Sequence, residues 1–278
     1  MKKVLILLSI IIVSCNSPKK EEKKTIKEWT LKEVIKIDGI NPIGIALKGE
    51  ELWLSDSDHN RLVQIDTTGN IIKTVNDFDR PMHIDANTTS IYVPQYGIDT
   101  VTVLTNNTRK VVPLQIELDA PAGVSTYKDE LAIVDFYNNQ IHYNNGNQWS
   151  SFGSEGNANG QFYYPTDVQI TSNEIWVADA YNHRVQVFDK KGVFVRAIAW
   201  DQGINAATGI FVSKDEVFVT DFENDRVLIF DHKGVLKQEL KDKVNKPTDM
   251  IIKENILYTL NYRQSTINAY VLESVLKK

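Results

Sequence analysis

The sequence predicts an all-β protein, a six-bladed β-propeller of four-stranded antiparallel blades. One unit of about 40 residues recurs six times, and a fixed period of this length is typical of propellers and solenoids. Within each unit, short apolar or alternating segments of strand length are separated by turn residues. A spare strand-like segment before the first unit matches a strand that the last unit lacks. The units begin at anchors spaced 39, 40, 44, 42 and 40 residues apart, namely Pro42, Pro81, Pro121, Pro165, Ala207 and Pro247.

Three strands follow from the pattern of each unit. The first begins at the anchor, as in PTDVQI, and the second shows period-two alternation, as in EIWVAD. The third starts five residues after the second ends, as in RVQVFD. An aromatic residue recurs in the second strand, where we expect it to pack between neighbouring sheets. These aromatic positions are Trp53, Tyr92, Trp176, Phe218 and Tyr258, with Ala132 in the third unit.

The fourth strand and the closure of the ring complete the assignment. In four units the fourth strand follows a glycine turn, as in VFVRAI after Gly192. The sixth unit lacks this strand, because only LESVLKK follows Val271. We expect residues 29–38 (WTLKEVIKID) to complete the last sheet, so that the propeller occupies residues 29–278. Closure protects the sheet edges that an open array would expose.

Polar residues between the second and third strands repeat, and we therefore interpret them as structural. The second strand ends in Asp in four units, and an Arg follows five residues later in three of them. Such an aspartate can accept N–H groups of a tight turn, and it can pair with the arginine across that turn. The repeated positions are Asp56, Asp135, Asp179, Asp221, Arg61, Arg184 and Arg226.

Units four and five resemble NHL repeats. Their second strands read WVAD and FVTD, and NHRVQVFD followed by a glycine turn is similar to the NHL signature. The connector SFGSEGNANGQFYYP resembles the Gly-rich link between NHL blades. The resemblance covers about residues 30–272 and implies a six-bladed β-propeller. It implies no single activity, because this fold carries unrelated functions.

The N-terminal residues predict export and a lipid anchor. Two lysines precede an apolar run, Val4 to Val13, which is too short to span a bilayer. The run ends near Cys15, the only cysteine, and IVSC resembles the bacterial lipoprotein signal in which the cysteine receives the lipid. An ordinary secretory signal is the alternative. The KKEE run resembles surface-export signals of some Bacteroidetes lipoproteins. We expect the lipid to anchor the protein in the outer membrane, with the propeller facing either the periplasm or the exterior. We assign a signal peptide to residues 1–14 and a lipidated flexible tether to residues 15–28.

Charge and motif content narrow the classes of function. The formal net charge is −5, and loss of the two N-terminal lysines makes it −7, which argues against a nucleic-acid partner. The sequence contains no G-x-S-x-G elbow, no H-E-x-x-H and no phosphate loop. We therefore expect a monomeric, noncatalytic binding or scaffold protein that needs no cofactor and contacts the membrane only through its lipid.

One candidate site surrounds the central channel. The positions two residues after each anchor should ring one mouth of it: Gly44, His83, Gly123, Asp167, Gly209 and Asp249. His83, Asp167 and Asp249 are candidate ligand-binding and metal-ligating residues, because an imidazole and two carboxylates can hold calcium or zinc. Alternatively, the aspartates bond to neighbouring turns. Six-bladed relatives include metal-dependent lactonases and an amidating lyase, so a metal-dependent hydrolase or lyase at this mouth is the alternative function.

The second candidate site is aromatic. The turns after the second strands should lie on the same face as the channel mouth, and they carry large side chains. Clustered aromatic residues on a loop-bearing face favour recognition of a protein, peptide or glycan. Alternatively, half of them lie between blades. We expect Phe162, Tyr163 and Tyr164, at the end of the long connector, to lie near these turns. The candidate ligand-binding residues are Tyr96, Phe136, Tyr137, Tyr181, Phe222 and Tyr262.

Overall fold

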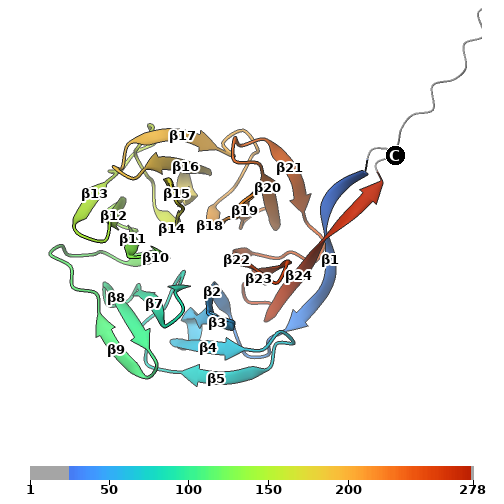
Figure 1. The fold of residues 1–278 in the computed structure, drawn as a ribbon, viewed down its shortest axis with the longest axis horizontal. Helices are drawn as coiled ribbons and strands as arrows, with labels where there is room; N and C mark the ends of the chain where they lie inside the picture. The colour runs from blue at the N-terminus through green and yellow to red at the C-terminus, as the bar shows by residue number, and fades with distance from the viewer. Residues whose placement is uncertain (1–24, 277–278) are drawn as a thin grey trace, which may run out of the picture.

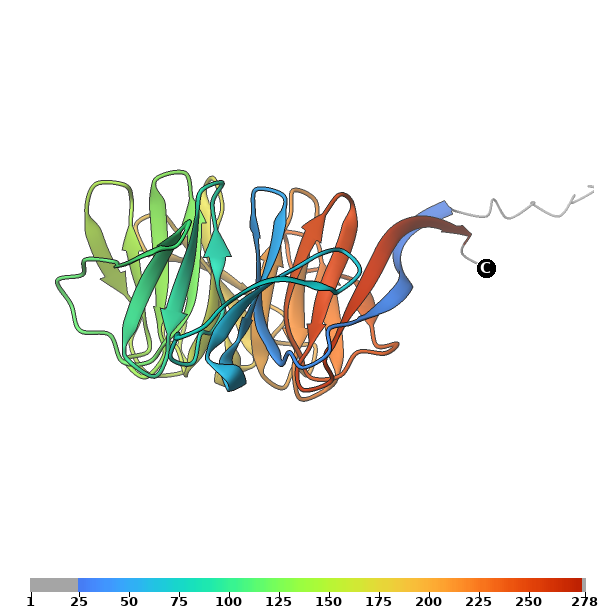
Figure 2. The same cartoon turned by 90° about the horizontal axis from the view of Figure 1, so that it is seen from below.

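The computed structural model describes residues 25–276 and confirms the predicted architecture. Six sheets, each of four antiparallel strands, surround a central axis (Figure 1). Seen from the side, the six sheets form a disc (Figure 2). The predicted signal peptide and Cys15 lie outside the described residues. Within them, no helix is long and apolar enough to cross a membrane.

The blades follow the repeats. In the first five blades the strands run outward from the channel in chain order, and in the sixth β1 is the outermost strand. The first three blades consist of β2 (Pro42–Lys48), β3 (Glu51–Asp56), β4 (Arg61–Ile65) and β5 (Ile71–Val75); β6 (Asp85–Ala86), β7 (Ser90–Gln95), β8 (Thr100–Thr105) and β9 (Thr108–Val111); and β10 (Pro121–Tyr127), β11 (Glu130–Asp135), β12 (Gln140–Asn144) and β13 (Trp149–Phe152). The last three consist of β14 (Pro165–Ile170), β15 (Glu174–Asp179), β16 (Arg184–Asp189) and β17 (Phe194–Ile198); β18 (Ala207–Val212), β19 (Val217–Asp221), β20 (Arg226–Phe230) and β21 (Leu236–Leu240); and β22 (Pro247–Lys253), β23 (Ile256–Asn261), β24 (Thr266–Leu276) and β1 (Thr25–Lys36).

The N-terminal strand closes the ring. β1 pairs antiparallel with β24 as the outermost strand of the sixth blade. It begins at Thr25, so residues 25–28, which we assigned to the tether, are part of the strand. Trp29 ties this strand to blade five, because its indole N–H donates to Glu216 at 2.8 Å and its ring packs edge-on against Phe218. Closure therefore includes side-chain contacts between blades as well as strand pairing.

The core lies between adjacent blades. The recurrent aromatic residues of the second strands form part of it: Trp53, Trp176, Phe218 and Tyr258 are buried, whereas Tyr92 is half-buried. Apolar residues of two neighbouring sheets surround each of these rings. Burial of these rings and of the aliphatic residues beside them is the main stabilising term of such a fold.

The residue that ends each second strand holds the turn beside it. In every blade its side-chain oxygen accepts the N–H of the segment before the first strand, at 2.7–3.3 Å. In three blades an arginine five residues later also donates to this carboxylate, as Arg184 does to Asp179 at 2.9 Å. In the third blade the His142 Nε2–H group donates to the Asp135 carboxylate instead, at 2.9 Å. Because the bond to the preceding segment recurs in all six blades, we assign the residues that end the second strands a structural role.

Candidate functional site

The turns into the first strands and the turns after the second strands lie on one side of the disc, which we call the loop face. Backbone hydrogen bonds join the two sets: Tyr137 N–H donates to Asp119 O, and Tyr181 N–H donates to Tyr163 O. The short helix η1 (Ser57–His59) lies on this face, at the lower edge of the disc in Figure 2. The six ring positions around the channel are at the loop-face ends of the innermost strands.

The ring positions alternate between glycine and a polar side chain around the channel. A Cβ atom on Gly209 would lie 2.2 Å from Thr248 O, and one on Gly123 would lie 2.7 Å from Thr166 O. A Cβ atom on Gly44 would lie 2.7 Å from two backbone atoms, Met82 O and Ile84 N, of the segment before β6. Glycine in every second blade therefore lets the next inner strand approach closely. The three intervening blades place His83, Asp167 and Asp249 at the axis.

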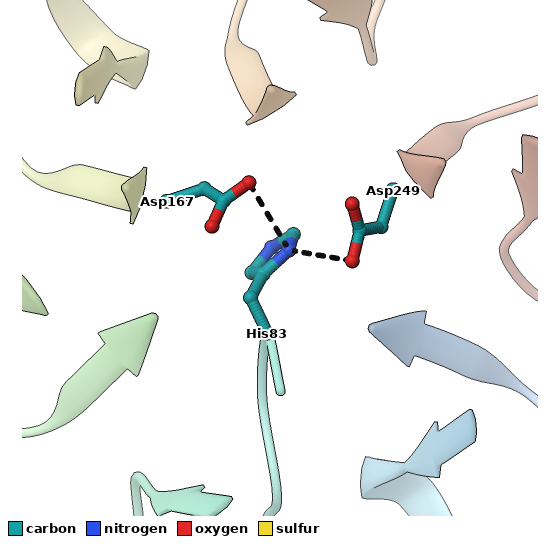
Figure 3. Close-up of side chains that lie close together, drawn as sticks. All are labelled: His83, Asp167 and Asp249. Atoms are coloured by element: carbon teal, nitrogen blue, oxygen red, sulfur yellow. Dashed lines mark ion pairs between the residues drawn. The ribbon is translucent and has the colours of Figure 1, made fainter. Parts of the chain in front are cut away.

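His83, Asp167 and Asp249 converge from three alternate blades (Figure 3). The His83 Nδ1 atom lies 3.6 Å from Asp249 Oδ2 and 4.0 Å from Asp167 Oδ2. One ligand atom from each residue lies within 4.8 Å of the others. The three residues are 4%, 6% and 6% exposed, so they are largely shielded from solvent. His83 Nδ1 is buried and makes no hydrogen bond.

Both carboxylates also bond to the backbone. Asp167 accepts the N–H of Val168 at 2.8 Å and that of Ile210, in the next blade, at 2.9 Å. Asp249 likewise accepts the N–H of its own neighbour and that of Ile45 in the first blade. The aspartates therefore join consecutive blades, as the structural alternative in the sequence analysis expected. Each carboxylate has roughly four lone-pair sites, so two bonds leave capacity for a cation.

The pKa values of the cluster reflect burial and mutual charge. Burial acts to lower the pKa of His83, but the charges of Asp167 and Asp249 outweigh it and raise that pKa above its ordinary value. Burial raises the pKa of Asp167 to about 7, with a further increase from Asp249 and a decrease from His83. The negative charge of the aspartates therefore stabilises the protonated form of the buried His83 imidazole.

The aromatic candidates of blades two, three and four form one continuous group, which we call the aromatic cluster. Tyr96 contacts Phe136 and Tyr137, with ring centroids 5.8 and 5.9 Å apart. Phe136 stacks on Tyr164 at 4.9 Å, and Tyr164 in turn contacts Tyr181 at 5.3 Å. The cluster consists of Tyr96, Phe136, Tyr137, Tyr163, Tyr164 and Tyr181.

The other aromatic residues lie elsewhere. Phe222 and Tyr262 form a separate pair, 6.3 Å apart, and each ring lies against a cation, Lys246 and Arg263 respectively. Phe162, which we placed near the recognition surface, is fully buried in the core between blades three and four. The next residue, Tyr163, is exposed, and Tyr164 after it is half-buried with a positive φ of 52°.

Sequence reasoning missed two features of the site. It named the glycines of the ring but not their alternation, which was visible as glycine two residues after the first, third and fifth anchors. It also left Tyr163 and Tyr164 outside the candidate list, although they join the rings of blade three to Tyr181. Their position at the end of the long connector was the available signal.

Comparison with known proteins identifies the repeat. The NHL repeat model matches residues 162–188, which contain the end of the connector, the first and second strands of blade four and all but the last residue of the third. The chain is a six-bladed β-propeller with an NHL repeat. No curated protein sequence matches this chain.

Solved structures share its fold at low sequence identity. Virginiamycin B lyase from Staphylococcus aureus has a TM-score of 0.64 and 12% identity, over 88% of this chain and all of that one. A chain of the nidogen–laminin complex has a TM-score of 0.64 and 15% identity, over 75% and 83%. A protein of unknown function from Bacteroides thetaiotaomicron has a TM-score of 0.68 and 14% identity, over 90% and 77%. These similarities concern the fold alone.

Proposed function

We propose that this NHL propeller is a noncatalytic binding or scaffold protein of the cell envelope, which captures a protein, peptide or glycan on its loop face. The observation that carries the proposal is the aromatic cluster. Tyr137, Tyr163 and Tyr181 are 49%, 39% and 55% exposed, although each has a large apolar ring. Exposed, contiguous aromatic residues are typical of binding surfaces, because a partner removes their rings from water.

The ring geometry supports a preorganised surface. The ring plane of Tyr137 makes an angle of 90° with that of Tyr164, and the ring plane of Tyr181 makes an angle of 79° with it. The two exposed rings therefore both pack against the half-buried ring of Tyr164. Edge-to-face contacts of this kind are favourable and restrict rotation of the rings. Rings that are already ordered lose little entropy when a partner binds.

The position at which strand β1 begins is compatible with a lipid anchor at Cys15. We propose that residues 1–14 are a signal peptide and that the lipidated Cys15 holds the protein at the outer membrane. The first residues of β1 lie at the outer rim, toward the side of the disc opposite the loop face (Figure 2). A chain anchored before β1 would then present the aromatic cluster away from the membrane.

A capture experiment tests this function. Wild-type protein and the double variant Tyr137→Ala/Tyr181→Ala are used to capture partners from envelope extract. We expect the double variant to lose the partners that the wild type retains, with unchanged circular dichroism. Ile72→Ala, which truncates an exposed apolar residue on the outer strand β5, is the control and should retain them. Equal capture by all three proteins would rule out the aromatic cluster as the binding surface.

The second candidate function is a metal-dependent hydrolase or lyase, lactonase-like, at the channel. The buried cluster of His83, Asp167 and Asp249 favours it, and a lyase is among the proteins with the same fold. One nitrogen and two carboxylates fit a zinc site better than a calcium site, since calcium takes six to eight oxygen ligands. A zinc ion held there would polarise a substrate oxygen or lower the pKa of a bound water.

Metal content separates the two candidates. Near-stoichiometric zinc in the purified protein, lost in Asp167→Ala, would favour the enzyme. A metal-free protein that captures partners through Tyr137 and Tyr181 would favour the binding propeller.

A further inference from the structure

Three aromatic rings in the turns of the loop face each carry a cation of this chain. In blade two the Arg80 guanidinium lies 4.3 Å from the centroid of the Tyr96 ring. A cation is attracted to the face of an aromatic ring within about 6 Å of its centroid. The other two pairs are Lys246 with Phe222, at 5.2 Å, and Arg263 with Tyr262, at 4.8 Å.

The three most exposed rings of the aromatic cluster differ from these. We call Tyr137, Tyr163 and Tyr181 the uncovered rings, because within residues 25–276 no lysine or arginine lies over any of them. Their aromatic contacts are with other rings of the cluster, and all three remain open to solvent. A cation of a partner would therefore not compete with one of this chain.

The residue before the anchor accounts for this difference. In blades two, four and six it is Arg80, Tyr164 and Lys246, and each has a positive φ, of 50°, 52° and 45°. In blade six Lys246 lies over Phe222 of the preceding blade. In blade four Tyr164 stacks instead on Phe136 of the preceding blade, at 4.9 Å. Blade four thus supplies a further ring at the position where blades two and six supply a cation.

Two exposed carboxylates lie beside the uncovered rings. Asp119 is next to Tyr137, because its backbone carbonyl accepts the Tyr137 N–H at 3.2 Å. Glu155 forms a β-bridge with Phe162, the residue before Tyr163. In the part of the chain that the structure describes, neither carboxylate forms an ion pair. The uncovered rings therefore have unpaired negative charge beside them.

We propose that the aromatic cluster binds a basic, arginine-containing peptide segment of a partner protein, an inference that rests on the loop-face binding function proposed above. A guanidinium would lie on an uncovered ring as Arg80 lies on Tyr96 in the same cluster. Asp119 and Glu155 would accept charge-assisted hydrogen bonds from it. Arginine fits better than lysine, because its planar group both stacks on rings and bonds carboxylates in pairs. A neutral glycan would leave the carboxylates unpaired, and an acidic partner would be repelled.

A basic peptide and its neutral isostere test the proposal. Acetyl-Gly-Arg-Gly-Arg-Gly-amide, and the same peptide with citrulline in place of arginine, are titrated into the wild type at constant ionic strength. Chemical shifts of the backbone amides report binding. We expect the arginine peptide to bind about tenfold more tightly, about threefold for each guanidinium on an exposed ring. Equal affinity, or no binding of the arginine peptide, would overturn the proposal.

Variants separate this site from general attraction of a basic peptide to an acidic protein. Asp119→Asn/Glu155→Gln removes two charges beside the uncovered rings and should weaken binding of the arginine peptide several-fold. Asp129→Asn/Asp215→Asn is the matched control, because it removes two exposed charges from turns between first and second strands, on the side opposite the loop face. It should leave the affinity unchanged. Equal weakening by both pairs would overturn the proposal.

Competition distinguishes failure of this inference from failure of the loop-face function. Envelope partners that the wild type captures and Tyr137→Ala/Tyr181→Ala does not should be released by excess arginine peptide and retained in excess citrulline peptide. Retention in both peptides would overturn the basic-peptide inference and leave the loop-face function standing. Capture that does not depend on Tyr137 and Tyr181 would overturn both.

Discussion

Replacing Asp179 by alanine should destabilise the protein strongly, although the residue has the appearance of a catalytic carboxylate. Asp179 is fully buried and accepts four kinds of donor at about 2.9 Å: the Tyr163 backbone N–H and the side chains of Asn182, Arg184 and Gln186. Truncation leaves these donors without an acceptor and the guanidinium without its counter-ion.

The magnitude follows from these contacts. Removing one partner of a buried ion pair costs about 3–5 kcal/mol, because the remaining charge is uncompensated. For a protein of this size, that loss corresponds to a decrease in melting temperature of roughly 6–20 °C. Asp179→Asn should lose less, since the amide oxygen can still accept the Tyr163 N–H. The sixth blade has Asn261 at the equivalent position, where it accepts the corresponding N–H at 2.9 Å.

Chemical denaturation and thermal unfolding of the purified variants measure the effect. Asp215→Ala is the matched control, because Asp215 is exposed and its carboxylate makes none of the described hydrogen bonds. It should change stability by no more than about 0.5 kcal/mol. If Asp179→Ala unfolds within about 1 kcal/mol of wild type, the repeated aspartate does not hold the turn as we infer.

Three further predictions concern the ring, its closure and its charge. Gly209→Ala should lower stability by about 1–3 kcal/mol, because the new Cβ would lie 2.2 Å from Thr248 O; an unchanged unfolding midpoint would contradict the close approach of blades five and six. Trp29→Ala should cost about 3–5 kcal/mol and speed amide exchange in β24, since it removes a buried ring and its bond to Glu216; unchanged exchange would argue against closure through this residue. Burial raises the pKa of Asp85 to about 6 from 3.8, so ionisation should cost the wild type stability as pH rises between these values. Asp85→Asn should lack this loss when unfolding is compared at about pH 4 and about pH 7, and identical pH profiles would refute the shift.

The repeats allowed much of the fold to be predicted. Aligning six copies located the strands, the turn aspartates and the closing strand, because each copy must form the same blade. The ring positions followed from the same alignment, since equivalent residues of a propeller surround its axis. The start of β1 at Thr25 was missed, because the sequence before Trp29 is charged and has no apolar pattern; its pairing with β24 holds it in the sheet.

The aromatic surface could be predicted only in part. Tyr96, Phe136, Tyr137 and Tyr181 were named from their turns, but Phe222 and Tyr262 lie apart from them as a separate pair. Position in a turn does not specify the direction of a ring. That direction depends on neighbouring blades.

The sequence by itself determined the number of blades and the residues that surround the axis, because periodicity and strand alternation are local properties. Only the tertiary structure decided how those residues meet. Glycine in alternate blades allows the inner strands to approach, and this approach brings His83, Asp167 and Asp249 together from positions at least 82 residues apart. The same packing buries these three residues beside a cavity of about 210 Å³ in the channel. The physical reason is that burial and proximity depend on contacts between blades, which no single repeat contains.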